Sequence, residues 1–213
     1  MMLLSTKKIL IVSSLALCSL SAFSQSDSTV VTHFSNGKVK TVFHYKDGLK
    51  TGLGMYFTES GNITGEEYYK EGKLDGIYKR YNGSGQQQEE SNYKNGELDG
   101  EVKKYYQTSK VQEEGIYKNG VRNGVTKWYF TNGNIATLYN YVDGEIEGEA
   151  RTYYDNGSVK SIFTYEKSSR EGDYREFYED GTLKVEGQYK NGEKKGTWKN
   201  YTPQGKIESK DRY

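Results

Sequence analysis

The chain has 213 residues, of which only 33% are apolar, whereas tyrosine alone contributes 21 residues and glycine 25. This balance argues against a thick aliphatic core and favours a thin sheet, in which tyrosine rings cover the backbone while their hydroxyls stay in water. The 30 lysine and arginine residues are interspersed with 29 aspartate and glutamate residues. We therefore expect no nucleic-acid partner, because phosphate binding needs a net basic face.

Residues 1–24 have the features of a cleavable signal peptide, which is expected to form a short signal helix. Lys7 and Lys8 provide a basic flank, and the apolar run at 9–17 is too short to span a bilayer. Small residues precede the expected cleavage site between Ser24 and Gln25. The sequence therefore predicts an exported protein that is periplasmic, located at the outer envelope, or secreted.

Cys18 leaves a lipoprotein as the alternative, which the bulky Leu17 before it disfavours. It is the only cysteine, so a mature chain from Gln25 has no disulfide to stabilise it after export. No second apolar run is long enough to cross a membrane, and we expect no integral membrane segment in the mature chain.

Residues 25–44 are interpreted as a partial repeat or cap, and residues 45–213 as seven repeats of 24 residues each. Counted from the opening tyrosine as position zero, every repeat has glycine at position seven and an aromatic residue at position twelve. A fixed period of this size indicates a repeat architecture. The tyrosines that recur at position zero are Tyr45, Tyr69, Tyr93, Tyr117, Tyr141, Tyr165, Tyr189 and Tyr213.

Each repeat contains two turn signals. Pairs such as Asn119-Gly120 occupy positions two and three, and pairs such as Asn132-Gly133 occupy positions fifteen and sixteen. Both dipeptides tolerate the positive φ angles of a two-residue type I′ hairpin turn. We therefore predict an all-β fold, an elongated single-layer antiparallel meander of repeated β-hairpins. The glycine at position seven is predicted to let a neighbouring ring lie flat across bare backbone.

A two-residue turn at positions fifteen and sixteen would place position ten opposite position twenty-one. This register predicts three ion pairs across the hairpins, Lys79 with Glu90, Lys103 with Glu114, and Arg175 with Glu186. It also predicts that positions nine, eleven, thirteen, eighteen, twenty-two and the opening tyrosine share one face. The basic residues at position ten and the rings at position twelve share the other.

The columns at positions ten and twelve are our candidates for partner binding. Their rings could stack on sugars or hold an extended peptide, or they could serve only to cover the sheet. Their cations could dock on an acidic surface, although pairing with glutamate already accounts for half of them. The candidates are Tyr81, Tyr105, Tyr129, Tyr153, Tyr201, Lys79, Lys103, Lys127, Arg151 and Arg175.

The sequence offers no constellation for catalysis. His33 and His44 are the only histidines, and the mature chain has no cysteine, so neither a zinc site nor a thiol site is expected. The many carboxylates are scattered, which is typical of solvated surface residues rather than of a paired acid and base. We expect no enzymatic activity, no cofactor and no metal.

The repeat resembles the bacterial variant of the MORN repeat over residues ~33 to 213. The resemblance rests on Tyr-Lys-Asn-Gly at 189–192, Gly-x-Trp at 196–198 and Tyr-x-x-x-Gly at 201–205. Ser109 and Ser168 depart from the pattern by replacing glycine. The resemblance implies a sheet of hairpins that contacts proteins or, in some eukaryotic members, lipid head groups. Many bacterial relatives are labelled YwqK-type antitoxins.

Our leading hypothesis is a non-catalytic exported repeat protein that acts as a protein-binding scaffold through its sheet surface. One alternative is an antitoxin or immunity-like inhibitor of a toxin. Another is a glycan-binding module of the cell envelope.

Overall fold

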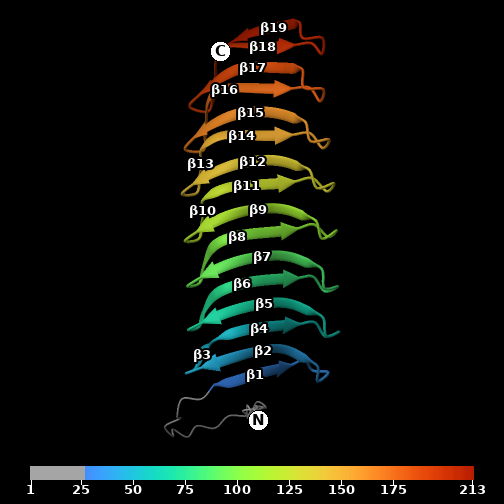
Figure 1. Cartoon of the computed structure of the whole chain (residues 1–213), viewed down its shortest axis with the longest axis vertical. Coiled ribbons are helices and arrows are strands. Elements are labelled where there is room, and N and C mark those ends of the chain that lie inside the picture. Colours follow the sequence, from blue (N-terminus) through green and yellow to red (C-terminus); the bar gives the residue numbers. More distant parts are fainter. Residues whose placement is uncertain (1–26) are drawn as a thin grey trace, which may run out of the picture. The chain divides into compact units, whose positions relative to one another are not determined.

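The computed structural model describes residues 27–213, and the chain it describes consists of strands, turns and loops without a helix. Tertiary contacts divide the chain into two compact units. The N-terminal unit ends at Glu97, and the C-terminal unit runs from Leu98 to Tyr213. In each unit the hairpins follow one another in a single antiparallel layer (Figure 1). The all-β prediction is confirmed, whereas the signal peptide, its cleavage site and Cys18 lie outside the described residues.

Within each unit, strands that follow one another in the chain are paired in antiparallel fashion, except that each of the short strands β3, β10 and β13 and the strand after it both pair with the strand before them. The strands that begin in the N-terminal unit are β1 (Ser28–His33), β2 (Val39–Lys46), β3 (Leu49–Lys50), β4 (Gly52–Phe57), β5 (Ile63–Lys70), β6 (Lys73–Tyr81), β7 (Gln87–Lys94) and β8 (Glu97–Tyr105), of which β8 lies almost wholly in the C-terminal unit. The remaining strands are β9 (Val111–Lys118), β10 (Val121–Arg122), β11 (Gly124–Tyr129), β12 (Ile135–Val142), β13 (Glu145–Ile146), β14 (Gly148–Tyr153), β15 (Val159–Glu166), β16 (Ser169–Phe177), β17 (Leu183–Lys190), β18 (Glu193–Tyr201) and β19 (Ile207–Arg212).

The turn at positions two and three is the predicted type I′ turn. Asn119 and Gly120 both have positive φ angles, 49° and 79°, and the equivalent pairs in the other repeats share this property. The turns of successive repeats are also bonded to one another, because the N–H of Gly144 donates to the carbonyl of Arg122 at 2.8 Å. We call this side of the sheet the turn edge.

Acidic side chains at position six reinforce the turn edge. The carboxylate of Asp75 accepts the N–H of Asn95 at 3.1 Å, and that of Glu171 accepts the N–H of Asn191 at 2.8 Å. Each carboxylate therefore stabilises the positive-φ turn of the following repeat.

The opposite side of the sheet, the loop edge, differs from the prediction of a second two-residue turn. The N–H of Phe130 donates to the carbonyl of Asn134 at 2.8 Å and closes a loop of three residues. Gly133 has a φ of 100°, whereas Asn132, which a type I′ turn would also require in this region, does not have a positive φ. The Asn-Gly pair is thus part of a longer hairpin loop with glycine in the left-handed conformation.

The register is as predicted in the middle of each hairpin and slips near the loop edge. Position ten faces position twenty-one, for example Lys79 opposite Glu90. Next to the loop, however, Tyr129 pairs with Ile135, although Trp128 pairs with Thr137. The return strand therefore holds one extra residue, and position eighteen pairs with position twelve instead of lying opposite position thirteen.

This register separates two faces in each unit. Side chains alternate between the two faces along each strand. One face, which we call the ring face, carries positions zero, five, nine, eleven, twenty and twenty-two. The other, which we call the charged face, carries positions eight, ten, twelve, twenty-one and twenty-three. The buried side chains all belong to the ring face: Phe43, Ser91, Val102, Thr126, Ala150, Ser161, Phe163 and Trp198. The core of each unit is therefore a thin stripe on one side of the sheet.

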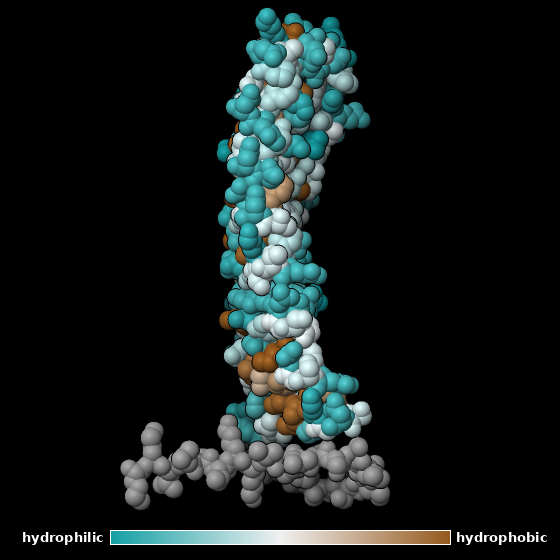
Figure 2. Space-filling view, turned by 90° about the vertical axis from the view of Figure 1, so that its right-hand side faces the viewer, coloured by the Kyte–Doolittle hydropathy of each residue, from teal (hydrophilic) through white to brown (hydrophobic). Residues whose placement is uncertain are grey.

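Figure 2 shows the molecule from the side on which the loop edge lies in Figure 1. Hydrophilic residues cover most of the surface in this view, and hydrophobic residues gather near the first strands of the N-terminal unit.

The glycine at position seven is required by the backbone in every repeat, and a tyrosine lies against it at Gly76, where an added Cβ would be 3.0 Å from the Cβ of Tyr68. The φ of this glycine is positive in all seven repeats, for instance 67° at Gly52 and 126° at Gly76. A Cβ added at Gly52, Gly148, Gly172 or Gly196 would meet no atom within 4 Å, so no ring requires the bare backbone there. The glycine instead allows a bulge between hairpins. Between the pairs Phe163–Tyr174 and Tyr165–Arg170, one residue of β15 lies opposite three residues of β16.

Rings lie closest to bare backbone at positions nine and twenty-two. A Cβ added at Gly54 would clash with the ring of Phe43, and one added at Gly187 would clash with the indole of Trp198. A large ring in one strand thus faces a glycine in the next.

Replacing Gly52 by alanine should destabilise the N-terminal unit by about 1 to 2 kcal/mol, because alanine is strained at positive φ. Gly52→Asn should cost less, since asparagine tolerates the left-handed region. Urea unfolding followed by circular dichroism would measure both changes. Gly83→Ala is the matched control, because Gly83 has no positive φ and its added Cβ would meet no atom within 4 Å. Equal stability of the Gly52→Ala and Gly83→Ala variants would contradict the backbone explanation.

Candidate functional site

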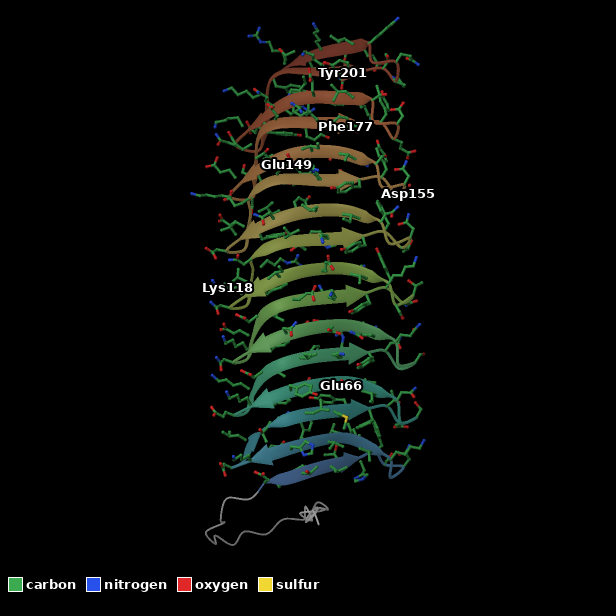
Figure 3. The ribbon with its side chains drawn as sticks, in the orientation of Figure 1. Glu66, Lys118, Glu149, Asp155, Phe177 and Tyr201 are labelled. Carbon is green, nitrogen blue, oxygen red and sulfur yellow. The ribbon has the colours of Figure 1, made fainter. Side chains whose placement is uncertain are left out.

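The ten partner-binding candidates from the sequence all lie on the charged face of their unit. The five tyrosines and the three lysines are half-buried, whereas Arg151 and Arg175 are exposed. The position-twelve rings of neighbouring repeats lie in a row, as Phe177 and Tyr201 do in Figure 3. In the same view Asp155 marks the loop edge and Lys118 the turn edge.

A recurring cluster on the charged face joins positions ten, twelve and twenty-one. Glu114 Oε1 lies 2.9 Å from the ammonium of Lys127 and accepts the hydroxyl of Tyr129 at 2.6 Å. Glu186 has the same two partners three repeats later, Lys199 at 2.7 Å and Tyr201 at 2.8 Å. Each cluster connects one hairpin with the following one.

The predicted pairing of charges across the hairpins is only partly correct. Lys79 does pair with Glu90, at 3.5 Å. Lys103 faces Glu114 in the register but pairs with Glu101 of its own strand, at 2.9 Å.

Arg175 likewise faces Glu186, which pairs with Lys199 instead. The physical reason is that a glutamate on an interior strand has a basic residue on either side. Sequence reasoning considered only the neighbour within the hairpin. Lys199 and then Tyr201, by donating hydrogen bonds, hold the pKa of Glu186 below its usual value.

Two shallow depressions recur on the charged face of the C-terminal unit. One, of about 190 Å³, lies between Glu101, Glu114 and Lys127, and the other, of about 230 Å³, lies between Asp173, Arg175 and Glu186. Both volumes fall below the ~300 Å³ at which enclosed ligand pockets begin. The charged face therefore presents a corrugated surface.

The ring face is covered by aromatic contacts of mostly edge-to-face geometry. The centroids of Phe43 and Tyr56 lie 5.3 Å apart at 84°, and those of Trp128 and Tyr139 lie 5.7 Å apart at 77°. Such contacts stabilise neighbouring strands beyond simple burial.

Sequence reasoning missed a set of cations at position five of the ring face. The ammonium of Lys50 lies 3.8 Å from the ring centroid of Phe43 and 4.6 Å from that of Tyr69. The guanidinium of Arg122 lies over Trp128 at 5.4 Å. The signal was present in the sequence, since position five is basic in four repeats: Lys50, Arg122, Arg170 and Lys194.

Glu67 is a second feature of the ring face that the sequence did not reveal. Its Oε2 accepts hydrogen bonds from the hydroxyls of both Tyr56, at 3.0 Å, and Tyr69. Burial raises the pKa of Tyr56 to about 12, and the hydrogen bond to Glu67 and its charge contribute to this rise. The pKa of Tyr69 is raised by the same causes.

Within residues 27–213 there is no group of three or more histidine, cysteine or acidic side chains able to hold a metal ion. That part of the chain also lacks a helix that is long and apolar enough to cross a membrane.

These hairpins define a single-layer β-repeat protein. Six consecutive segments match the family model described as the MORN repeat variant, at 74–95, 98–119, 122–143, 146–167, 170–191 and 194–213. The matches cover more than half of the chain, which therefore belongs to the MORN repeat variant family. They confirm the resemblance to the MORN repeat that the sequence indicated. Repeats of this family are generally non-catalytic and bind proteins or membranes. No curated protein matches the chain.

Raising the pH should destabilise the N-terminal unit through Tyr56. Its hydroxyl loses a proton near pH ~10 when unfolded but near 12 when folded. The stability contributed by the neutral hydroxyl is thus fully present below pH ~10. It is lost as the pH rises through the pKa of Tyr56 in the folded protein.

Glu67→Gln should lower the pKa of Tyr56 toward ~10, because it removes a charge beside the ring. NMR of tyrosine Cζ nuclei, with Tyr56→Phe to assign the signal, would measure this. An unchanged pKa in the Glu67→Gln variant would show that burial alone raises it.

Proposed function

We propose that this chain is an exported, non-catalytic repeat protein that binds another protein through the charged face of its sheet. The observation that carries this proposal is the ordered row of half-buried rings and cations on a single-layer sheet. Within residues 27–213 no second layer of structure covers these side chains. Membership of a family whose repeats generally bind proteins or membranes also supports it.

The energetics of the charged face favour exchange with a partner. A partly exposed ion pair such as Lys79 with Glu90 contributes at most about 1 kcal/mol. A carboxylate of a partner can therefore replace Glu90 at little cost. Arg175 is exposed and forms no ion pair with another described residue, so it is already available to an acidic group.

Tyrosine provides the remaining affinity in this proposal. The position-twelve rings combine a large apolar surface with a hydroxyl, the combination that is enriched in protein interfaces. Spaced by one repeat, or about 9.6 Å for two strands, these rings suit an extended or flat protein surface.

Export is proposed from the basic flank, the short apolar run and the small residues before Gln25. Secretion of the full-length chain from a bacterial host should yield a protein whose first residue is Gln25. Intact-mass spectrometry would check this. A mass that retains residues 1–24, or a lipid attached at Cys18, would contradict the proposed processing.

Replacing Tyr105, Tyr129 and Tyr153 together by alanine should weaken partner binding by at least about tenfold, because three rings leave one surface. Affinity capture with the mature chain would identify the partner, and surface plasmon resonance would measure the change. Lys118→Ala, on the turn edge, is the control and should bind normally. Thermal unfolding must show that the triple variant stays folded.

The captured molecule separates the proposal from its alternatives. A secreted or envelope protein supports a scaffold. A toxin that loses activity on binding would make the chain an antitoxin-like inhibitor. Binding to polysaccharide alone would make it a glycan-binding module and would contradict the proposal.

A further inference from the structure

The position-five cations of the ring face share one geometry. Each lies over the opening tyrosine of the following repeat. Lys50 lies 4.6 Å from the centroid of Tyr69, and Arg170 lies 5.3 Å from that of Tyr189. Both also lie over a phenylalanine at position twenty-two of the preceding hairpin, Phe43 or Phe163. The sheet thus has a repeated place for a cation between aromatic rings.

The second repeat has the same place without a cation of its own. Its position five is Leu74, which is shorter than lysine or arginine and carries no charge. The following opening tyrosine is Tyr93, which contacts Tyr78 edge-to-face with centroids 5.8 Å apart. Glu67 occupies position twenty-two of the preceding hairpin, which is the position of Phe43 beside Lys50 and of Phe163 beside Arg170. An aromatic place that holds a cation elsewhere therefore contains a carboxylate here.

The carboxylate of Glu67 is arranged to receive such a cation. The hydroxyls of Tyr56 and Tyr69 both donate to Oε2. Oε1 accepts no hydrogen bond from any residue described in the N-terminal unit, and Glu67 forms no ion pair there. One oxygen is thus fixed by two hydroxyls, and the other remains available.

The other charged groups nearby leave the place anionic. Burial is the main cause that raises the pKa of Tyr78 and of Tyr93. The negative charges of Glu89 and Glu67 raise both pKa values further, so both carboxylates lie near the two rings. Arg80 approaches Glu89 only loosely, at 3.9 Å, and its side chain is 56% exposed. The ammonium of Lys50 lies over the ring of Phe43 and donates to the hydroxyl of Tyr69 at 3.4 Å, without an ion pair to Glu67.

We propose that Glu67, Tyr78 and Tyr93, around Leu74, form a site for a lysine or arginine side chain of the partner protein. The cation takes the place over Tyr93 that Lys50 and Arg170 take over their own tyrosines, and it pairs with Glu67 Oε1. Cations over tyrosine faces are favourable, and more so beside a carboxylate. This inference rests on the proposed function and adds a basic anchor on the ring face to the contacts on the charged face.

The test uses the folded mature chain and a short probe, the acetylated and amidated peptide Gly-Arg-Gly-Arg-Gly. NMR of the tyrosine rings should show shifts of Tyr78 and Tyr93 on titration. The same peptide with citrulline in place of arginine should bind at least about tenfold more weakly, because it keeps the shape and loses the charge.

Two variants address the site itself. Leu74→Arg should place the chain's own guanidinium over Tyr93 and reduce peptide affinity by about tenfold or more, without loss of folding. Glu67→Gln should cause a similar loss while still accepting the tyrosine hydroxyls. Ile146→Arg is the matched control, since Ile146 also occupies position five but has Tyr139 in place of Glu67, and it should bind as the unmodified chain does.

The proposal is overturned if Leu74→Arg binds the peptide normally, if the citrulline peptide binds equally well, or if the shifts arise at other tyrosines. The partner assay separates this inference from the proposed function. A partner captured equally well by the Leu74→Arg variant would remove the site and leave the function. Specific arginine binding without any captured protein would leave the site and remove the function.

Discussion

The constraint on which the whole structure depends is the backbone register between hairpins. Positive φ angles at the turn dipeptide and at the glycine of position seven fix where each strand reverses and where it bulges. The turns are then bonded to one another, as in the hydrogen bond from Gly144 to Arg122. Because the period never slips, each side chain meets its own counterpart from the neighbouring repeats. Stability is therefore a sum of similar contacts between nearest neighbours.

The ring face shows how a single layer can be stable without a second sheet or a helix. Large rings are placed against small residues, Phe43 against Gly54 and Trp198 against Gly187. Other rings pack edge-to-face against these two, Tyr56 against Phe43 and Tyr189 against Trp198. Cations at position five then cover the rings and keep the face soluble. The same arrangement explains why replacing one cation by Leu74 changes the chemistry of the face locally.

The charged face follows a different logic, because its charges are not committed to one partner. A glutamate such as Glu114 lies between a basic residue of its own hairpin and one of the next, and Lys127 rather than Lys103 binds it. Pairs of this kind are weak at a surface and are easily rearranged. Such a face suits recognition, since a partner can substitute its own carboxylates for those of the sheet.

The sequence by itself determined the repeat, the all-β class, the type I′ turns and the central register, because these depend on local backbone preferences and on a period of fixed length. It also placed Tyr129 and Lys127 on one face. Only the tertiary structure decided which strand supplies each ion-pair partner, why position seven needs glycine, and how the loop at Gly133 shifts the register. These features depend on contacts between hairpins, where each side chain has two neighbours to choose from and local propensity favours neither.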